Sequence, residues 1–431
     1  MARKNNDEKK NKRRKQPIAP SHTKSYYRFS KDFPSVTDSE GYRDNEVFVN
    51  SPAKKASLRR RLIAVFASVF VVTYITVMLG FAVSRLPAEE KGEVSQGNTA
   101  ITVLEGFNGA ILSGDTLSYN SVENIIGDFR MYGIDTVVID FKDASGYFYF
   151  RPSLAVSGDA LYKASDNAAD VVRQFRDADI TVLARIACFA DDIYARNNQD
   201  KAAYVIQTPE SGSYQQIKKL WYNTGSDSHA WLNPYSNEVL YYLRTITTDV
   251  AALGVDGILF DYVVLPDTTE SDRPVFEGAS ESGKSVQEQI TSFIVTLNST
   301  YISCETGVFI PHEKMIPALA DKTIPGICYS GCDFIVPDAR LSTMPDNTIL
   351  GNIKYTKPSV SPAEFIKQYT EGIHSLLASD ETLAGTYIVP MLEASDSSGV
   401  QIISVASGGG SSYIVSSDTM IYSAENFNSI Q

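Results

Sequence analysis

The chain has 431 residues, of which 43% are hydrophobic and 21% are charged. It is long enough for one large domain or two ordinary ones, and too apolar to be disordered throughout. The net charge is −12, yet residues 1–61 hold 17 basic against 7 acidic residues, so the remainder holds 22 basic against 44 acidic. An acidic surface repels phosphate groups, which excludes nucleic acid as the partner of the larger part of the chain.

The first hundred residues predict a membrane anchor. Residues 1–61 are polar and basic without periodicity, which indicates a disordered tail. Leu62–Val83 follows as 22 uncharged residues, enough to cross a hydrocarbon core of about 30 Å. Because Arg59, Arg60 and Arg61 precede this span, we expect the tail in the cytoplasm and the rest outside the cell. Signal-peptidase cleavage after residues 82–84 is the alternative, but the length of the span favours an uncleaved signal-anchor. Residues 84–100 are expected to form a stalk.

From residue 101 onward, apolar strands alternate with amphipathic helices. Gly133–Phe141 (GIDTVVIDF) matches Gly254–Tyr262 (GVDGILFDY) position by position, and Thr181–Arg185 repeats the strand part. Each copy follows a helical pattern; the one before Gly133 has apolar residues at 122, 125, 126 and 129. A helix, a glycine cap and then an apolar strand is a repeating βα unit, and it predicts a parallel sheet covered by helices.

Eight such strands can be assigned over residues 101–431. Besides the three repeated ones, the candidates are Phe107–Leu112, Gly307–Ile310, Phe334–Pro337, Tyr387–Leu392 and Tyr413–Ser416. Eight strands in a region of this length predict an α/β fold of the (β/α)8 TIM-barrel type. An open doubly wound sheet is the alternative, although no G-x-G-x-x-G or Walker loop follows an early strand.

Polar residues occupy equivalent places at three strand ends. Asp140, Arg185 and Asp261 each follow an apolar run at the same position of the repeat. Active sites of (β/α)8 barrels lie at the carboxyl ends of the strands, so we expect these three side chains to meet in the barrel mouth. The alternative is a purely structural role, in which each aspartate caps its own loop. Lys142 and Asp143 continue the end of the second strand, and they are expected to contact the same ligand.

A second carboxylate, Glu393, ends the seventh strand. Two carboxylates that face each other across a mouth are the requirement for glycosidic bond cleavage. Aromatic residues nearby, including Trp231 and Tyr262, suit the apolar faces of sugar rings, although each is individually more typical of core packing. No serine-hydrolase motif, metal-ligand spacing or cofactor loop is present, so we expect no metal and no cofactor. The four cysteines indicate buried thiols or one optional disulfide.

Four segments together resemble a bacterial family described as a "putative glycosyl hydrolase domain", which is similar to the α-amylase-like TIM-barrel hydrolases. They are VVIDFKDASG (137–146), ARIACFADDIYA (184–195), WLNPYSNEV (231–239) and LGVDGILFDYVVLPD (253–267). The resemblance covers most of residues 103–395 and is strong up to residue 267. It implies a TIM barrel that acts on glycans.

The family motifs fall on residues of this chain one by one. The V-I-D-x-K-D motif covers residues 138–143, A-R-I-x-x-F falls on 184–189, and W-x-N-P-Y covers 231–235. The resemblance thereby adds Asn233 to the expected substrate contacts and makes Asp261 the nucleophile, as in amylase-like relatives. The sequence departs from the family at Val264, where the family has an arginine, and Arg340 is the candidate replacement.

The resulting hypothesis is a membrane-anchored hydrolase outside the cell that cleaves an envelope or environmental polysaccharide. Asp261 is expected to be ionised by the neighbouring Arg185, and Glu393 to be the proton donor. The substrate contacts are expected from Asp140, Lys142, Asp143, Arg185, Trp231, Asn233 and Tyr262. The rival hypothesis is a catalytically inactive barrel that binds glycan or organises wall proteins.

Overall fold

The structure is a computed structural model. It describes residues 107–207, 217–224, 228–269, 272–350, 353–356, 361–395, 398–417, 419, 422–423 and 426–427. All of them lie within one compact unit, Gly97–Gln431. No helix among these residues is both long and apolar enough to span a membrane. The predicted tail 1–61, span 62–83 and stalk 84–100 lie outside the described residues.

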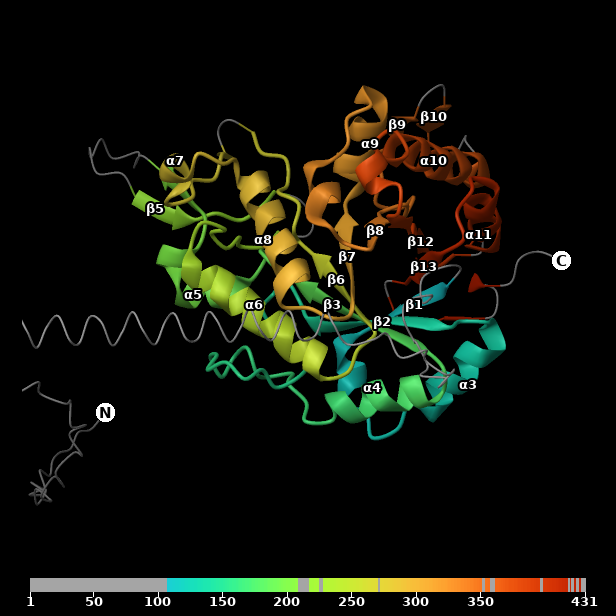
Figure 1. The fold of residues 1–431 in the computed structure, drawn as a ribbon, viewed down its shortest axis with the longest axis horizontal. Coiled ribbons are helices and arrows are strands. Elements are labelled where there is room, and N and C mark those ends of the chain that lie inside the picture. Colours follow the sequence, from blue (N-terminus) through green and yellow to red (C-terminus); the bar gives the residue numbers. More distant parts are fainter. Residues whose placement is uncertain are drawn as a thin grey trace, which may run out of the picture. The chain divides into compact units, whose positions relative to one another are not determined.

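Nine parallel strands form the main sheet, and every strand predicted from the sequence is found in it. The spatial order is β11-β8-β7-β6-β3-β2-β1-β13-β12, so most neighbours in space are also successive main-sheet strands of the chain (Figure 1). The strands are β1 (Asn108–Leu112), β2 (Thr136–Lys142), β3 (Thr181–Ala187), β6 (Gly257–Asp261), β7 (Glu305–Ile310), β8 (Phe334–Pro337), β11 (Tyr387–Ile388), β12 (Met391–Glu393) and β13 (Tyr413–Ser416).

The two outermost strands of this order are consecutive parts of one segment, residues 387–393. β11 pairs with β8, whereas β12 pairs with β13. Between them, the N–H of Val389 donates to β8, and the carbonyl of Pro390 accepts a hydrogen bond from β13. Proline has no N–H to donate, which explains why the strand is interrupted there. The segment therefore contacts both β8 and β13, and the sheet is curled and TIM-barrel-like.

Helices connect the strands and lie around the outside of the sheet. Their ends carry the expected signals: the side chain of Ser236 caps α6 by accepting from the N–H of Val239. Gly133 ends α3 in the left-handed conformation, which glycine adopts without a steric penalty. The helices are α3 (Glu123–Tyr132), α4 (Ala168–Asp177), α5 (Asp192–Asn197), α6 (Asn237–Ala252), α7 (Ala279–Ser282), α8 (Val286–Thr300), α9 (His312–Asp321), α10 (Pro362–Leu377) and α11 (Ser398–Ser407).

Several elements in the loops were not predicted from the sequence. Two antiparallel hairpins occur there, β4 (Tyr204–Gln207) with β5 (Ile217–Leu220) and β9 (Asn347–Leu350) with β10 (Ile353–Thr356). Short 3-10 helices cover residues 114–118, 199–201, 326–330 and 381–383. These segments lack a sustained hydrophobic period, so pattern alone does not detect them.

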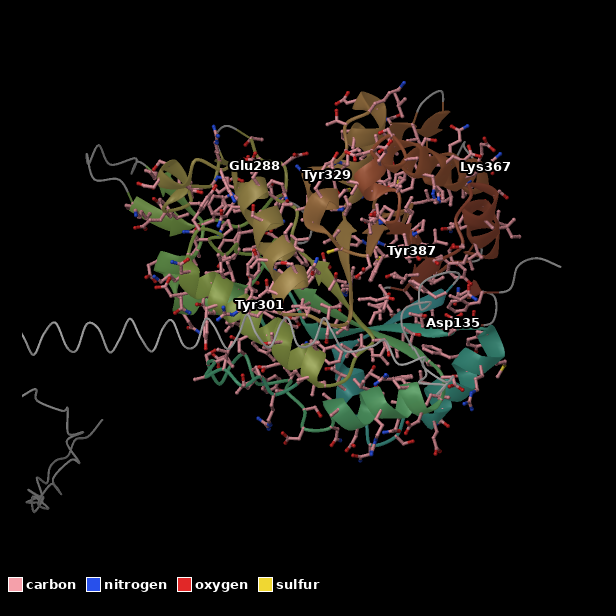
Figure 2. The ribbon with its side chains drawn as sticks, viewed as in Figure 1. Asp135, Glu288, Tyr301, Tyr329, Lys367 and Tyr387 are labelled. Carbon is pink, nitrogen blue, oxygen red and sulfur yellow. The ribbon has the colours of Figure 1, made fainter. Side chains whose placement is uncertain are left out.

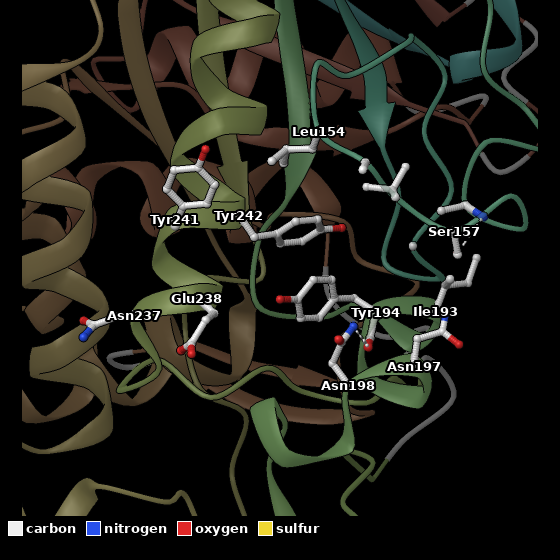
Figure 3. A pocket seen from close by; sticks show the side chains of 14 residues that line it. Leu154, Ser157, Ile193, Tyr194, Asn197, Asn198, Asn237, Glu238, Tyr241 and Tyr242 are labelled. Carbon is white, nitrogen blue, oxygen red and sulfur yellow. Dashed lines mark hydrogen bonds between the residues drawn. The ribbon is translucent and has the colours of Figure 1, made fainter. Parts of the chain in front are cut away.

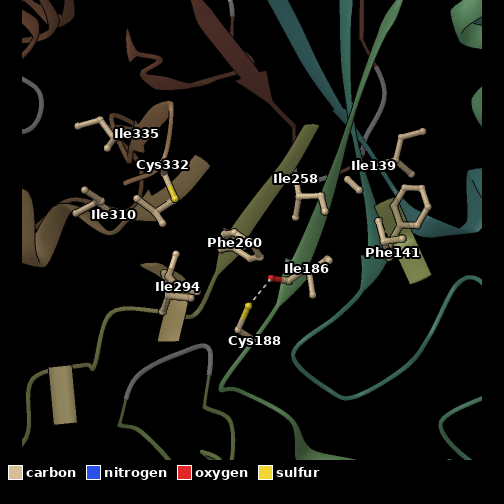
Figure 4. Close-up of a cluster of buried hydrophobic side chains, with 14 of the residues drawn as sticks. Ile139, Phe141, Ile186, Cys188, Ile258, Phe260, Ile294, Ile310, Cys332 and Ile335 are labelled. Atoms are coloured by element: carbon tan, nitrogen blue, oxygen red, sulfur yellow. Dashed lines mark hydrogen bonds between the residues drawn. The ribbon is translucent and has the colours of Figure 1, made fainter. Parts of the chain in front are cut away.

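Two hydrophobic clusters separate the inside of the sheet from its outside. The interior cluster takes one or two residues from each of seven strands, such as Val138 from β2 and Leu183 from β3. The outer cluster, between the sheet and the helices, takes the alternate residues, among them Ile139, Phe141 and Ile258 (Figure 4). Alternation along a strand points successive side chains to opposite faces. The position of each strand residue relative to the interior cluster therefore fixes which way it points.

An aspartate before a strand stabilises the amino-terminal end of a neighbouring strand in three places. Asp135, labelled in Figure 2, accepts a hydrogen bond of 2.7 Å from the N–H of Asn108 at the start of β1. Asp256 accepts one of 2.9 Å from the N–H of Val182 in β3. Asp333 repeats this contact with β7 through a 2.8 Å bond. These carboxylates satisfy strand N–H groups at the amino-terminal ends of the strands, where a barrel carries stability rather than chemistry.

Glu305, at the start of β7, is the exception at this end of the sheet. It is 8% exposed, and its Oε2 has no hydrogen-bond partner among the described residues. Burial raises its pKa from 4.5 to about 7, and the nearby charges of Asp333 and Asp256 act in the same direction. The folded state therefore holds a proton on Glu305 at pH values where the unfolded state has released it.

We predict that Glu305→Gln stabilises the protein at neutral pH. Since the folded pKa lies above the unfolded one, the wild type should lose stability as the pH rises from about 4.5 to 7. The variant lacks this loss, so its free energy of unfolding should be about 1–3 kcal/mol higher at pH 7.5 and unchanged at pH 4. Urea denaturation at both pH values measures this, with the half-exposed Glu371→Gln as control. An equal effect at both pH values would contradict the assignment.

Candidate active site

The side chains at the carboxyl end of the sheet follow from the interior cluster by alternation. Val138, Leu183 and Leu259 belong to that cluster. The residues two positions further are Asp140, Arg185 and Asp261. Because a strand returns to the same face every second residue, these three point into the mouth of the sheet. Val336 and Met391 place Asp338 and Glu393 there in the same way.

The structure brings Asp140, Arg185 and Asp261 together on adjacent strands. Asp140 pairs in register with Arg185. The guanidinium of Arg185 donates two hydrogen bonds to the carboxylate of Asp140, of 2.5 Å from Nε and 3.0 Å from Nη2. Its third nitrogen, Nη1, lies 3.9 Å from Oδ2 of Asp261. A two-point contact of this kind fixes both partners in one geometry. Arg185 is therefore committed to Asp140 and only approaches Asp261.

Asp261 does not have the lowered pKa that its neighbour suggested. Burial raises its pKa above the ordinary value of 3.8, and this outweighs the lowering effects of the Arg185 charge and of the hydrogen bond from the N–H of Tyr262. The charge of Arg185 therefore favours the ionised form of Asp261, as expected, but burial is the larger effect on its pKa. The physical reason is that Arg185 spends its hydrogen bonds on Asp140, while Asp261 is only 9% exposed.

Tyr262 adopts a backbone conformation that is rare for its type. Its φ of 53° is in the left-handed region, where a side chain causes strain. This turn places its N–H 2.7 Å from Oδ1 of Asp261. One oxygen of Asp261 is thereby held by the backbone that follows it. Strained residues of this sort concentrate at functional sites.

A second arginine clamp lies at the end of β8. Nε and Nη2 of Arg340 donate to Asp338 at 2.8 and 3.0 Å. Asp338 is 3% exposed, and although burial acts to raise its pKa, hydrogen bonds from His312 and Arg340 bring it below its usual value. The charge of Arg340 also acts to lower the pKa of Asp261. Arg340 therefore acts electrostatically on Asp261. An arginine that replaces the family arginine, whose place is taken here by Val264, would need to do this.

A pocket of about 210 Å³ opens over Asp261. Its rim includes His229, which the sequence analysis did not select because it stands alone in a loop. Nδ1 of His229 lies 3.0 Å from Oδ2 of Asp192, and its ring is perpendicular to that of Tyr262 at 5.8 Å. The lining residues are Asp140, Lys142, Asp143, Ala144, Ser145, Arg185, Ala187, His229, Asp261 and Tyr262.

Lys142 belongs to the protein interior although it borders this pocket. Its side chain has no exposed surface and forms an ion pair of 2.9 Å with the equally buried Asp191. Its ammonium also donates to the carbonyls of Ala187 at 2.9 Å and of Asp143 at 3.4 Å. Three acceptors use all three N–H bonds of a lysine. Lys142 therefore supports the wall of the pocket, and it is not placed to bind a substrate as predicted.

Trp231 and Asn233 are also buried rather than exposed to a ligand. Trp231 is 1% exposed and packs in the core against Trp221. Asn233 is 2% exposed, accepts from the N–H of Tyr235 and donates to the carbonyl of Glu277. Both act in loop and core packing, so their expected substrate contacts are not supported by this geometry. The signal in the sequence was the motif, which does not distinguish a structural role from a binding role.

Five carboxylates face the mouth, and their hydrogen bonds distinguish two of them. Asp140 and Asp338 each have both oxygens bound by an arginine, and both oxygens of Asp143 accept, from the N–H of Tyr147 and the hydroxyl of Tyr149. Asp261 accepts only on Oδ1, and Glu393 accepts only on Oε2, from the N–H of Ser342 at 3.0 Å. Among these five described carboxylates, only Asp261 and Glu393 keep an oxygen without a hydrogen bond. Glu393 does not line the 210 Å³ pocket; it ends β12, five positions away from β6 in the strand order of the sheet.

The described residues contain no group of three or more His, Cys, Asp or Glu side chains able to hold a metal ion. All four cysteines are free thiols. Burial raises the pKa of Cys328 to about 12 and that of Cys304 to about 11. Thiols with such values are poor nucleophiles, so cysteine chemistry does not account for this site.

Residues 110–310 match the model of a family described as "Putative glycosyl hydrolase domain". The match confirms the resemblance seen in the motifs and supports a glycan-related, hydrolase-like function for this region. It ends before Asp338, Arg340 and Glu393. No curated protein matches the chain.

Several solved structures resemble the fold at low identity. A hypothetical protein from Ruminiclostridium thermocellum has 20% identity, covers 46% of this chain and 96% of its own, and gives a TM-score of 0.34. Trehalose-6-phosphate hydrolase from Bacillus licheniformis has 8% identity over 72% of this chain, with a TM-score of 0.45. This chain spans 64% of that hydrolase, less than two thirds. A variant of the glycoside hydrolase domain of PelA from Pseudomonas aeruginosa has 12% identity, covers 73% of this chain and 96% of its own, and gives 0.40.

Proposed function

We propose that the protein hydrolyses glycosidic bonds with Asp261 and Glu393 as its carboxylate pair. The observation that carries the proposal is the hydrogen bonding at the mouth, where only these two carboxylates keep an unbonded oxygen. A carboxyl group that transfers a proton or attacks an anomeric carbon needs such an oxygen. The family match over residues 110–310 supports the glycan as substrate.

The two carboxyl groups take the roles that their surroundings favour. We assign Asp261 as the proton donor, because burial raises its pKa, and this direction favours the acid form. It gives this proton to the glycosidic oxygen as the bond to the anomeric carbon breaks. Glu393 acts on the anomeric carbon from the other side of the sugar, as a nucleophile or through a water molecule. This assignment reverses the roles expected from the sequence.

The remaining charged groups hold the site in shape. The Arg185–Asp140 pair fixes a positive charge 3.9 Å from Asp261, which limits how far burial can raise the pKa of that group. Asp143, whose side chain is 25% exposed, is the group best placed to bind sugar hydroxyls. The pocket of about 210 Å³ is smaller than the roughly 300–1,000 Å³ of typical ligand pockets, and it suits one sugar on the Asp261 side of the cleaved bond.

The barrel and its location complete the proposal. We infer a closed (β/α)8 barrel in which β11 and β12 count as one strand, because residues 387–393 contact both β8 and β13. We also propose that Leu62–Val83 anchors this domain to the outer face of the cell membrane. The support for the anchor is the uncharged span and its basic flank. The substrate would then be an envelope or environmental polysaccharide.

Leaving-group dependence tests the pair. Asp261→Asn should lower kcat on a natural glycan by about 10²–10⁴, because the leaving sugar needs a proton, and much less on aryl glycosides whose phenol leaves unprotonated. Glu393→Gln should lower both rates alike, since every substrate needs attack at the anomeric carbon. Asp321→Asn, on the exposed end of α9, serves as the control.

Equal losses on both substrates in Asp261→Asn would remove Asp261 from the role of proton donor. Full activity in either variant would reject the pair. A wild-type protein that binds glycans without cleaving any would favour the rival function, an inactive glycan-binding barrel. The observation behind that rival is that Lys142, Trp231 and Asn233 are buried, which leaves fewer polar contacts for a substrate than the motifs indicate.

The anchor predicts a defined topology. Protease added to intact cells should remove residues 107–427 and leave residues 1–61 protected inside. A fluorescent tag at each end of the full chain reports the two fates separately. Protection of the C-terminal tag would contradict the proposed orientation.

A further inference from the structure

A second, larger pocket lies beside the loop that follows β2 (Figure 3). Its volume is about 700 Å³, within the range of ligand sites. It is formed by the loop after β2, by α5 and by the first turns of α6. The lining residues are Gly146, Leu154, Ala155, Val156, Ser157, Ala160, Ile193, Tyr194, Asn197, Asn198, Asn237, Glu238, Tyr241 and Tyr242.

Adjacent residues of the loop after β2 line the two pockets. Ser145 lines the pocket over Asp261, and the next residue, Gly146, lines the larger one. Gly146 has a φ of 94°, and a Cβ there would lie 2.2 Å from Oδ1 of Asp191, so only glycine fits. The N–H groups of Asp192 and Ile193 donate to the carbonyls of residues 144 and 145, at 3.2 Å each. These bonds hold this loop in place.

A buried polar network supports the larger pocket from below. The hydroxyl of Tyr242 donates to Oδ2 of Asp191 at 2.8 Å, and the same oxygen pairs with Lys142 at 2.9 Å. The ring of Tyr242 also packs against that of Tyr194, with centroids 4.2 Å apart. Residues whose side chains are locked by such contacts form a site before any ligand arrives. The pocket is therefore preformed.

The chemistry of the lining suits a carbohydrate. Tyr241 is 54% exposed, with Arg244 over its ring, which makes it a fixed aromatic surface at the rim. Leu154, Val156 and Ile193 supply apolar surface, while Ser157 and Asn197 supply hydroxyl and amide groups. A sugar ring has an apolar C–H face and a rim of hydroxyls, which match these two kinds of surface. None of the described residues that line the pocket is basic, so the pocket does not favour an acidic ligand.

We propose that this pocket binds sugar units of the substrate chain at a distance from the cleaved bond. The inference rests on the proposed function and extends it: the substrate is an uncharged or amino-sugar polysaccharide long enough to reach from the Asp261 pocket over residues 143–146. A chain that occupies both pockets gains binding energy that a single sugar at Asp261 cannot. The protein therefore discriminates by chain length.

Tyr241→Ala tests this, because the side chain is exposed and its loss should not disturb folding. The probes are di- and hexasaccharides of β-1,4-glucan, β-1,4-linked N-acetylglucosamine and α-1,4-glucan. Binding is measured by calorimetry on the full-length chain in detergent, with Asp261→Asn present in every variant so that the probes are not cleaved. Cleavage is measured in the same variants with Asp261 intact. Tyr241→Ala should weaken hexasaccharide binding about tenfold and leave aryl monosaccharide cleavage unchanged. Ala155→Arg, at another exposed lining position, should have the same effect by filling the pocket.

The control is Tyr329→Ala. Tyr329 is 44% exposed and precedes β8, so it lies toward the opposite end of the sheet. Its loss should change neither hexasaccharide binding nor the cleavage of aryl monosaccharides. If both pocket variants treat long and short glycans as the wild type does while the wild type cleaves them, the second site is rejected and the proposed function stands. If the wild type neither binds nor cleaves any probe, including aryl glycosides, both proposals fail. Hexasaccharide binding that is lost in Tyr241→Ala without any cleavage supports the site in a binding barrel.

Discussion

The mouth of the sheet depends on how Arg185 divides its contacts. Asp140 on β2 and Asp261 on β6 flank β3, and two carboxylates so close and so little exposed to solvent need a nearby cation. Arg185 gives two hydrogen bonds to Asp140 and leaves Asp261 at 3.9 Å. Both oxygens of Asp140 are thereby held, whereas Oδ2 of Asp261 accepts no hydrogen bond. An arginine shared equally between the two would have held both in place.

The same division appears on the other side of the mouth. Arg340 binds both oxygens of Asp338, and Glu393 on the neighbouring segment keeps an oxygen unbound. Each side thus has one carboxylate that positions a guanidinium and one that remains open. The wall behind Asp261 follows a related rule, because Lys142 and Asp191 neutralise each other in the interior and fix the loop between the two pockets. The open carboxylates at the mouth are thus surrounded by charged groups that already have partners.

Much of the fold could be predicted because the βα unit repeats in the sequence. The repeat contains two aspartates with different roles: Asp135 and Asp256 hold strand starts, whereas Asp140 and Asp261 enter the mouth. Alternation along each strand distinguishes the two, since the mouth residues lie two positions beyond an interior residue. It also identified Glu393, on a strand beyond the reach of the family match.

The remaining features depend on tertiary contacts that no period records. The strand register shifts between Asp140 and Lys142, so the side chain of Lys142 does not follow the alternation; it lies in the protein interior beside Asp191. His229 and the larger pocket come from loops, where neither helix nor strand spacing applies. The pKa of Asp261 results from burial against charge; the sequence indicates both effects but not that burial is the larger one.

A titration of Asp261 tests the central claim most directly. Carbon-13 NMR of protein labelled at aspartate carboxyls gives the pKa, with the resonance assigned by its absence in Asp261→Asn. The account predicts a midpoint above the ordinary value of 3.8, because burial outweighs the charge of Arg185. A midpoint at or below 3.8 would show that Arg185 dominates, and it would contradict the assignment of Asp261 as the proton donor.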